Sequence, residues 1–431
     1  MTGFLSPYRV LDLCDERGLL AGQMLAKLGA DVVQVEPLGG STARGIAPFS
    51  DDAAPGDNSF FWSAYAASKR SLALDLDRPE GRTLLGQLLE QADFLIESAD
   101  QAQRQAWGLD VDEIRLRYPK LIHVSISAFG REGPKADYAA SDLTIWAAGG
   151  PLLPSRDGVR PPVRMSIGQS WSNAASDAAG GALLAHHARL RSGRGQHVDV
   201  SAQQSAALCT LSASLAAPIG HPDFSIPGAA RPEPKQTAPK KQLDLSGSGA
   251  RTRRSKWTVL DGLVEMHIGL GPAGGRFANN LFRWLHSEQA CDNDIAAWDW
   301  ITLPQRILAE EISEADLERA RTQVAAFFAR FTKDQLMEKA IEHRLLCAPI
   351  ASTQDLLNSR QLAAREFFET VTEPSGAERT LPGAFVTGVN PGTVALKPAP
   401  TLGQHSAAVL QDWLGLSTEA IAEIKAKGVV V

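Results

Sequence analysis

The feature that most constrains the fold of this chain is a strand–helix–strand pattern near its start. Residues 8–13 form a short apolar run of strand-forming residues, and residues 19–28 follow a helical pattern that Gly29 ends. A second strand follows at 31–37 and stops at Pro37. Two strands joined by one helix within about 30 residues form a βαβ unit with a parallel strand pair. The chain is therefore predicted to begin with an α/β domain.

The alternation of strands and helices continues along the first half of the chain. Further strands are predicted at 71–76, 94–96, 121–127 and 197–201, and helices at 79–91 and 174–191. Alternating strands and helices favour a mostly parallel sheet covered by helices. Residues 1–216 are accordingly predicted to form a large α/β domain.

The composition changes sharply after this domain. Residues 217–256 are rich in Pro, Gly, Ser, Lys and Arg, which is typical of a linker. Beyond it, residues 257–269 have the pattern of a β-hairpin with an Asp-Gly turn at 261–262, and residues 303–347 are charged and helical. The expected parts are a linker over 217–256, a smaller domain over 257–347 and a C-terminal segment over 348–431.

Charge and cysteine content disfavour several classes of protein. The 431 residues carry a formal net charge of −6, which argues against nucleic acid as the main partner. The four cysteines form no CxxC pair and the nine histidines show no metal-ligand spacing, so no metal site is predicted. The sequence has no signal-peptide pattern and no apolar run of membrane-spanning length, so a cytoplasmic protein is expected.

One glycine motif invites a different interpretation. Gly269, Gly271 and Gly274 fit the GxGxxG pattern of dinucleotide-binding folds. However, the hairpin predicted in front of them is a poor start for such a unit, and the N-terminal βαβ unit lacks the pattern. Nicotinamide binding is therefore not predicted.

Several longer motifs together resemble CoA-transferase family III, the group that includes formyl-CoA transferase and the carnitine and bile-acid enzymes. Besides the N-terminal βαβ unit, they are SKRSLALDLDRPEGRTLLGQLLEQADFLIES at 68–98, YPKLIHVSISAFGREGPKADY at 118–138 and SGRGQHVDVS at 192–201. The segments LCAPIASTQDLLNSRQLAAREFF and PAPTLGQHSAAVL add to the similarity towards the C-terminus. The resemblance spans nearly the whole chain.

The resemblance implies an architecture that the residues alone do not. Members of the family place a Rossmann-like large domain first and a smaller α/β domain after a linker. Their C-terminal segment returns to the large domain, and two subunits interlock like links of a chain. The expected ligands are an acyl-CoA and a carboxylic acid, with coenzyme A as substrate and no metal.

The chemistry of the family depends on one carboxylate. An Asp attacks the acyl-CoA carbonyl to give a mixed anhydride, and the released CoA thiolate then forms an aspartyl-CoA thioester. The expected position, counted back from Ser192, falls on Trp171, or on Gln169 after a shift of two residues. Neither side chain is a carboxylate. The histidine of the family's racemases falls on Ser141, so the racemase pair is missing as well.

Three interpretations of the missing carboxylate follow. The preferred one is a non-catalytic subunit that pairs with an Asp-bearing relative, as in succinyl-CoA:(R)-benzylsuccinate CoA-transferase. In the second, Asp142 or Asp177 substitutes for the absent residue. In the third, the chain is an acyl-CoA isomerase, racemase or lyase of the same fold, or a regulatory subunit that binds CoA thioesters.

The resemblance also implies CoA contacts for seven residues: Arg17, Lys69, Arg70, Ser98, Arg104, Gly247 and Gly249. The Lys-Arg pair falls in a segment that touches the CoA phosphates, which suit ammonium and guanidinium groups. The two glycines lie in SGSGA, where transferases have a loop that closes over the active site. The acidic residues of DERG and the Ser-Ala pair at 98–99, where the family usually has Asn-Phe, depart from the family pattern.

Overall fold

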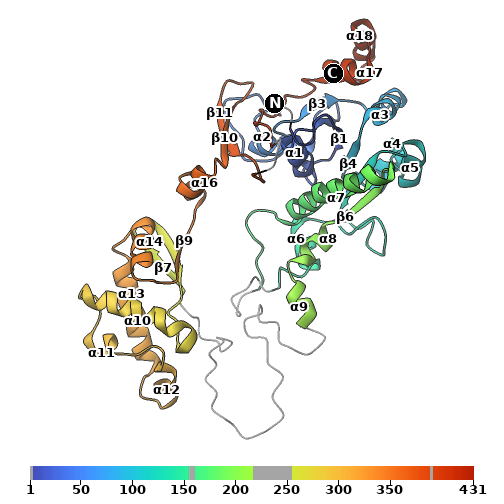
Figure 1. Ribbon diagram of the computed structural model, residues 1–431. Helices are drawn as coiled ribbons and strands as arrows, with labels where there is room; N and C mark the ends of the chain where they lie inside the picture. Colours follow the sequence, from blue (N-terminus) through green and yellow to red (C-terminus); the bar gives the residue numbers. More distant parts are fainter. Residues whose placement is uncertain (1–2, 154, 156–160, 217–254, 389–391) are drawn as a thin grey trace. The chain divides into compact units, whose positions relative to one another are not determined.

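The computed structural model describes residues 3–153, 155, 161–216, 255–388 and 392–431 (Figure 1). The chain divides into two compact units. The first, here the large unit, combines Met1–Ile219 with Arg360–Val431, and the second, the small unit, is Gly220–Ser359. Residues 360–431 of the predicted C-terminal segment group with the large unit, whereas residues 348–359 group with the small one. Most of the predicted linker lies outside the described residues, so its role stays a prediction.

A six-stranded sheet in the order β3-β2-β1-β4-β5-β6 organises the large unit. Its strands are β1 (Arg9–Leu13), β2 (Asp31–Glu36), β3 (Arg70–Ala73), β4 (Phe94–Glu97), β5 (Ile122–Ser127) and β6 (His197–Ser201). All neighbouring pairs are parallel. This is the Rossmann order, in which the chain reverses direction across the sheet between β1 and β4. The predicted α/β, Rossmann-like fold is confirmed.

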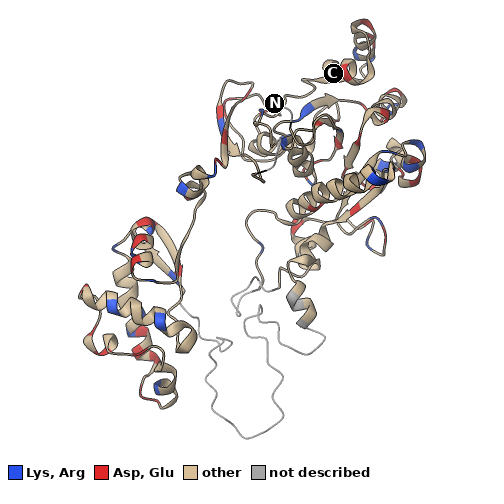
Figure 2. Ribbon diagram, in the orientation of Figure 1, with Lys and Arg blue, Asp and Glu red and all other residues tan. Residues whose placement is uncertain are grey.

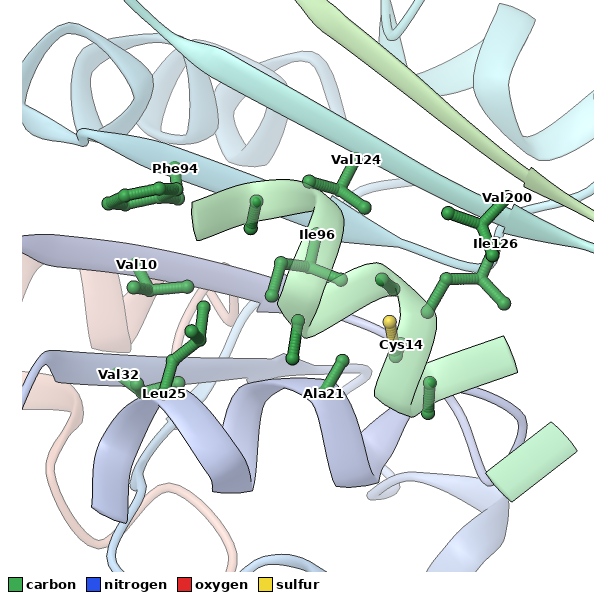
Figure 3. Close-up of a cluster of buried hydrophobic side chains, with 14 of the residues drawn as sticks. Val10, Cys14, Ala21, Leu25, Val32, Phe94, Ile96, Val124, Ile126 and Val200 are labelled. Carbon is green, nitrogen blue, oxygen red and sulfur yellow. The ribbon is translucent and has the colours of Figure 1, made fainter. Parts of the chain in front are cut away.

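One face of the sheet is covered by α1 (Leu19–Lys27) and α7 (Ser170–Ser192), which lie side by side (Figure 1). Alanines of α7 are buried against α1 and the sheet, because their small side chains let the helix backbones approach closely. Figure 3 shows this core, in which Val10, Ile96 and Val124 from three strands face Ala21 and Leu25 of α1. Most of α7 carries no charge (Figure 2).

The opposite face is covered by α3 (Pro79–Gln91) and by the C-terminal helices α17 (Ser406–Leu414) and α18 (Thr418–Ala426). Val409, Leu410 and Trp413 of α17 are buried with leucines of α3 and the strands. Residues from both ends of the chain therefore share one hydrophobic core. The chain must return to the large unit after the small one to form this core.

The large unit also contains shorter elements. They are the 3₁₀ turn η1 (Thr42–Gly45), the helices α2 (Phe60–Tyr65), α4 (Gln101–Trp107), α5 (Val111–Arg117), α6 (Asp142–Ala148), α8 (Ala202–Leu208), α9 (Leu211–Ala216) and α16 (Arg360–Ala364), and the antiparallel pair β10 (Phe368–Thr372) and β11 (Glu378–Pro382). Helix α7 begins at Ser170, earlier than its predicted start at 174, because the carboxylate of Asp142 accepts hydrogen bonds from the first backbone N–H groups.

The small unit has its own core around Trp257, Trp284 and Phe328. Its elements are β7 (Lys256–Val259), β8 (Gly262–Met266), β9 (Cys347–Ile350), α10 (Gly271–Ser287), α11 (Asn293–Ala296), α12 (Leu303–Leu308), α13 (Glu314–Phe328), α14 (Lys333–Glu342) and α15 (Thr353–Leu357). The predicted hairpin is present, and β8 pairs antiparallel with both neighbours. The GxGxxG stretch thus follows an antiparallel strand, unlike a dinucleotide-binding turn.

Candidate functional site

The candidate site lies at the carboxyl ends of β1, β4 and β5. A cavity of about 750 Å³ opens there, at the point where the strand order reverses. Open α/β sheets bind their ligands at this point. Residues that follow the three strands line it, together with α4, the 136–140 segment and the start of α7: Arg17, Ser98, Ala99, Arg104, Ile126, Ser127, Arg131, Tyr138 and Trp171. A smaller hollow of about 180 Å³ shares Arg17 and Ser98 with the cavity.

A buried ion pair between Lys69 and Asp12 supports the loop after β1. The Lys69 ammonium donates to Asp12 Oδ2 at 2.7 Å, to the Leu19 carbonyl at 2.8 Å and to Gln34 Oε1 at 2.9 Å. The other Asp12 oxygen accepts the N–H of Cys14, and Gln34 donates to the Cys14 carbonyl. Both side chains of the ion pair are fully buried. The network therefore fixes the backbone from which Arg17 projects.

This placement bears directly on the expected role of Lys69. An ammonium has three N–H donors, and all three are used inside the fold. Contact with a CoA phosphate would require the buried ion pair with Asp12 to break. Gly22 supports the pair, since a Cβ there would collide with the Asp12 carboxylate. The structure thus gives Lys69 the position of a support for the site rather than a place on its wall.

Arg17 and Ser98 meet at Asp15. The Arg17 guanidinium binds the Asp15 carboxylate through Nε and Nη2, the closest pair at 2.6 Å. Ser98 Oγ donates to the same carboxylate at 2.9 Å and accepts the Asp15 N–H at 3.0 Å. Burial works against the Arg17 charge, but the hydrogen bonds and charge of Asp15 raise its pKa overall. The two segments that depart from the family pattern, DERG and the Ser-Ala pair at 98–99, are thus hydrogen-bonded to each other at the cavity wall.

Trp171 occupies the wall where the family's carboxylate is expected. Its ring is half-buried and lies 5.9 Å from the Arg17 guanidinium carbon, within range of a cation–π interaction. Gln169, the alternative position, does not line the cavity, and its side-chain amide donates to the Ile167 carbonyl. Trp171 therefore lines the cavity and Gln169 does not, and which of the two replaces the family's carboxylate stays a prediction.

Neither proposed substitute acid lines the cavity. Asp142 Oδ1 accepts the N–H groups of Gln169 and Ser170 and the Ser170 hydroxyl at 2.5 Å, so it is engaged as a helix anchor. Asp177 is exposed on α7. Ser141, at the racemase histidine position, caps α6 by accepting the Thr144 N–H. Cys14 is buried, and burial raises its pKa well above 9.0, so it is a thiol rather than a thiolate at neutral pH.

Arg104 lies on the cavity wall without a counterion. Within the described chain its side chain makes no hydrogen bond or ion pair, and its Nε is buried without a partner. Burial lowers its pKa, and the neighbouring Arg131 charge adds to the effect. A partly desolvated cation in such surroundings favours an anionic ligand. Arg104 lines the cavity, and its CoA contact stays a prediction.

Sequence reasoning missed Arg131 and its partner Glu97. Both stood within motifs used for the family resemblance, FGREGP and DFLIES, but only as letters of a pattern. The Arg131 guanidinium pairs with the buried Glu97 carboxylate and donates to the Ala99 carbonyl at 3.0 Å. One signal in the sequence could have revealed Glu97. It is a charged residue at the very end of an otherwise apolar strand, and charged residues are rarely fully buried unless they are paired.

The remaining predicted contacts lie elsewhere. Arg70 begins β3 and therefore lies at the opposite edge of the parallel sheet, where it pairs with Asp31 and Asp412. It lines a separate cavity of about 770 Å³ with Lys397 and His405. Gly247 and Gly249 lie outside the described residues. The structure thus brings Arg17, Ser98, Arg104 and Trp171 together and leaves Arg70 apart.

The sequence profile of CoA-transferase family III matches residues 5–240 and 283–406, well over half of the chain. The chain belongs to CoA-transferase family III. Among similar family members is succinyl-CoA:(R)-benzylsuccinate CoA-transferase subunit BbsE of Thauera aromatica, 29% identical over 94% of this chain and 93% of that protein. Another is the succinyl-CoA–D-citramalate CoA-transferase of Chloroflexus aurantiacus, 29% identical over 99% of this chain and 98% of that protein.

A solved structure agrees with the family fold. A CAIB/BAIF family protein from Brucella suis superimposes with a TM-score of 0.75 at 22% identity, over 96% of this chain and 100% of that one. At this identity the likeness establishes the fold and nothing about substrates. Among the described residues no helix is long and apolar enough to cross a membrane, and no group of potential ligands is arranged to hold a metal ion.

Proposed function

We propose that this family III chain is the CoA-thioester-binding, non-catalytic subunit of a CoA-transferase, and that a homologous Asp-bearing subunit supplies the nucleophile. One observation carries the proposal: Trp171, packed towards Arg17, occupies the cavity wall where the carboxylate is expected. An indole cannot form an acyl anhydride. Neither substitute acid lines the cavity: Asp177 is exposed on α7, and Asp142 is engaged by several donors.

The cavity itself suits a CoA thioester. Its volume falls within the range of small-molecule sites, and its wall combines apolar surface with Arg104, a cation that has no partner in the described chain. CoA carries phosphates, which guanidinium groups bind through charge-assisted hydrogen bonds. A chain with such a site can bind acyl-CoA even where the transfer step takes place on another subunit.

The names of two relatives support a proposal for the class of acid. The Thauera aromatica protein is named as a subunit of a transferase between succinyl-CoA and (R)-benzylsuccinate, and the Chloroflexus aurantiacus enzyme uses succinyl-CoA and D-citramalate. All of these acyl groups derive from dicarboxylic acids. We accordingly propose a dicarboxylic substrate, an interlocked dimer of two related chains and a place in the cytoplasm.

The proposal is tested by locating the acyl-enzyme. The chain is purified from its native cells by an affinity tag, and co-purifying proteins are identified by mass spectrometry. The complex is then incubated with succinyl-CoA, trapped with borohydride or hydroxylamine, and digested to map the modified carboxylate. We expect a modified Asp on a co-purifying relative and none on this chain.

Two outcomes would contradict the proposal. A modified carboxylate on this chain would make it catalytic, and Asp142→Asn and Asp177→Asn would then show which acid reacts. A purified homodimer with full transferase activity would remove the need for a second subunit. If a relative co-purifies but no carboxylate is ever modified, the site binds CoA thioesters without transfer, as a regulatory subunit would.

A further inference from the structure

The end of β4 presents a buried carboxylate whose oxygens are fully engaged. Glu97 Oε1 accepts the Ser125 hydroxyl at 2.6 Å and the Arg131 guanidinium, and Oε2 accepts the Ala99 N–H at 2.7 Å. His123 Nε2 lies 3.4 Å from Oε1. The side chain has no solvent exposure. Burial alone raises the pKa of Glu97, yet the hydrogen bond from His123 and the charge of Arg131 outweigh it and hold the pKa at about 2.

The sheet register explains why these groups meet. Glu97 of β4 is the partner of Ser125 in β5, and His123 of β5 is the partner of His197 in β6. Residues at alternate positions of parallel strands share a face, so the four side chains form one polar row. Ser125 Oγ lies 2.9 Å from His197 Nε2. The row ends at Arg131, whose guanidinium pairs with Glu97.

Arg131 is fixed at both its backbone and its guanidinium. Its N–H donates to Asp199 Oδ2 at 2.9 Å, and its Nη1 donates to the Ala99 carbonyl. Its side chain is 9% exposed and lines the 750 Å³ cavity, and its Nε has no partner within the described chain. Arg131 thus stands at the cavity wall and keeps a guanidinium donor that no described group uses.

The three arginines that line the cavity differ in whether a carboxylate neutralises their charge. Arg17 and Arg131 each have a carboxylate partner, whereas Arg104 has none in the described chain. Two acids also line the cavity, Asp100 and Asp137, and both are exposed to solvent. The Asp100 carboxylate is engaged in capping α4. An anion between Arg104 and Arg131 would therefore relieve the repulsion between two partly desolvated guanidinium groups.

We infer that Arg131 is a ligand-binding residue that forms an anion subsite with Arg104, and that Glu97 is the positioning residue that aims Arg131 at the ligand. The inference rests on the proposed binding of a CoA thioester. The group bound is an oxyanion that accepts guanidinium N–H donors. It comes from a phosphate of CoA or from the free carboxylate of a dicarboxylic acyl chain.

Binding measurements separate these sources. Calorimetric titration of the purified protein uses CoA, 3′-dephospho-CoA and pantetheine to remove phosphates in turn, and succinyl-CoA against butyryl-CoA to remove the carboxylate. We expect Arg131→Met to weaken binding about 10- to 100-fold for ligands that carry the recognised anion. Ligands without that group should bind wild type and variant equally well.

The role of Glu97 needs variants that fold. Arg131→Met leaves a buried carboxylate unpaired, so the double variant Glu97→Gln/Arg131→Met, which removes both charges, is measured beside it. Arg131→Lys should recover part of the affinity because it restores the charge. Glu97→Gln alone should cost about tenfold, again only for ligands with the anion, because a merely structural role would weaken all ligands alike. Glu90→Gln, at a surface pair with Arg117, is the matched control.

The outcomes are distinct. Unchanged affinity in both the single and the double variant overturns the inference, and so does an equal loss for every ligand, including butyryl-pantetheine, which has neither phosphate nor carboxylate. If the wild-type protein binds none of the CoA compounds, the proposed function itself fails, and the subsite fails with it.

Discussion

Lys69 and Arg104 were both expected to contact CoA, yet the fold treats the two cations in opposite ways. Lys69 is buried with three acceptors, and its counterion Asp12 is equally buried. Arg104 stands at the cavity wall, and the described chain offers it no acceptor. A cation whose donors are all used by its own fold stabilises that fold, whereas a cation left without a partner is available to a ligand. The comparison makes opposite predictions for stability and for binding.

The largest effect is expected at Lys69. Lys69→Met leaves the Asp12 carboxylate buried without its counterion, which we expect to lower the free energy of unfolding by about 3–5 kcal/mol. Urea denaturation followed by circular dichroism measures this. The matched variant Arg104→Met should change stability by less than about 0.5 kcal/mol, since no described partner is lost. Equal losses in the two variants would remove the distinction between the two cations.

Of the two cations, Arg104 should make the larger contribution to CoA binding. A charge-assisted hydrogen bond contributes about 1.5–3 kcal/mol, so Arg104→Met is expected to weaken CoA binding about 10- to 100-fold. Isothermal titration with CoA gives the dissociation constant. Arg115→Met is the control, because Arg115 lies on the exposed α5 helix and lines neither hollow at the site. CoA affinity that is the same in Arg104→Met and in wild type would mean that CoA binds elsewhere.

The polar row behind the cavity should be visible in the pH dependence of stability. Burial, helped by the His123 charge, lowers the pKa of His197 to about 4. An unfolded histidine titrates near 6.5, so between about pH 6.5 and 4 the unfolded state binds a proton that the folded state excludes. Stability is therefore lost as the pH falls through this window, and the loss is complete below about pH 4.

His197→Gln should remove part of that loss. Allowing for solvent screening of this half-buried ring, we expect the variant to lose about 1–2 kcal/mol less than wild type between pH 6.5 and 4.5. The lowered pKa of Glu97, about 2 in the folded protein, causes its own loss of stability as the pH falls through the unfolded value of about 4.3. Restricting the range to pH 4.5 and above keeps that loss small, and it is common to wild type and variant. His267→Gln, at an exposed position of the small unit, is the control. Parallel pH profiles of wild type and His197→Gln would contradict the prediction.

The smallest effect is expected at Arg70. Its partners Asp31 and Asp412 are partly exposed, so Arg70→Gln should lower stability by less than about 1 kcal/mol. Because Arg70 lies at the opposite edge of the sheet from the cavity, we expect CoA affinity to stay within about twofold of wild type. A larger loss of affinity would restore the phosphate contact that the sequence predicts for Arg70, and would move the CoA site towards that edge.

The fold was largely readable from the sequence. Strand–helix alternation predicted the parallel sheet, because one apolar run followed by one amphipathic helix leaves few other arrangements. The helix at 79–91 was placed correctly because Pro79 occupies its first position, where a missing N–H costs nothing. The start of α7 was not, because its anchor Asp142 is distant in sequence and acts through tertiary contact.

The candidate site was readable only in part. The sequence alone determined that no carboxylate stands at Trp171 or Gln169, since that is a matter of residue identity. Whether a cation faces a ligand or a buried acid depends on strand register and on contacts between distant residues. Only the tertiary structure placed Lys69 on Asp12, aligned Glu97 with Ser125 and brought Arg131 to the wall beside Arg104. The sequence determines which residues are charged, but the tertiary structure determines which group each charge pairs with.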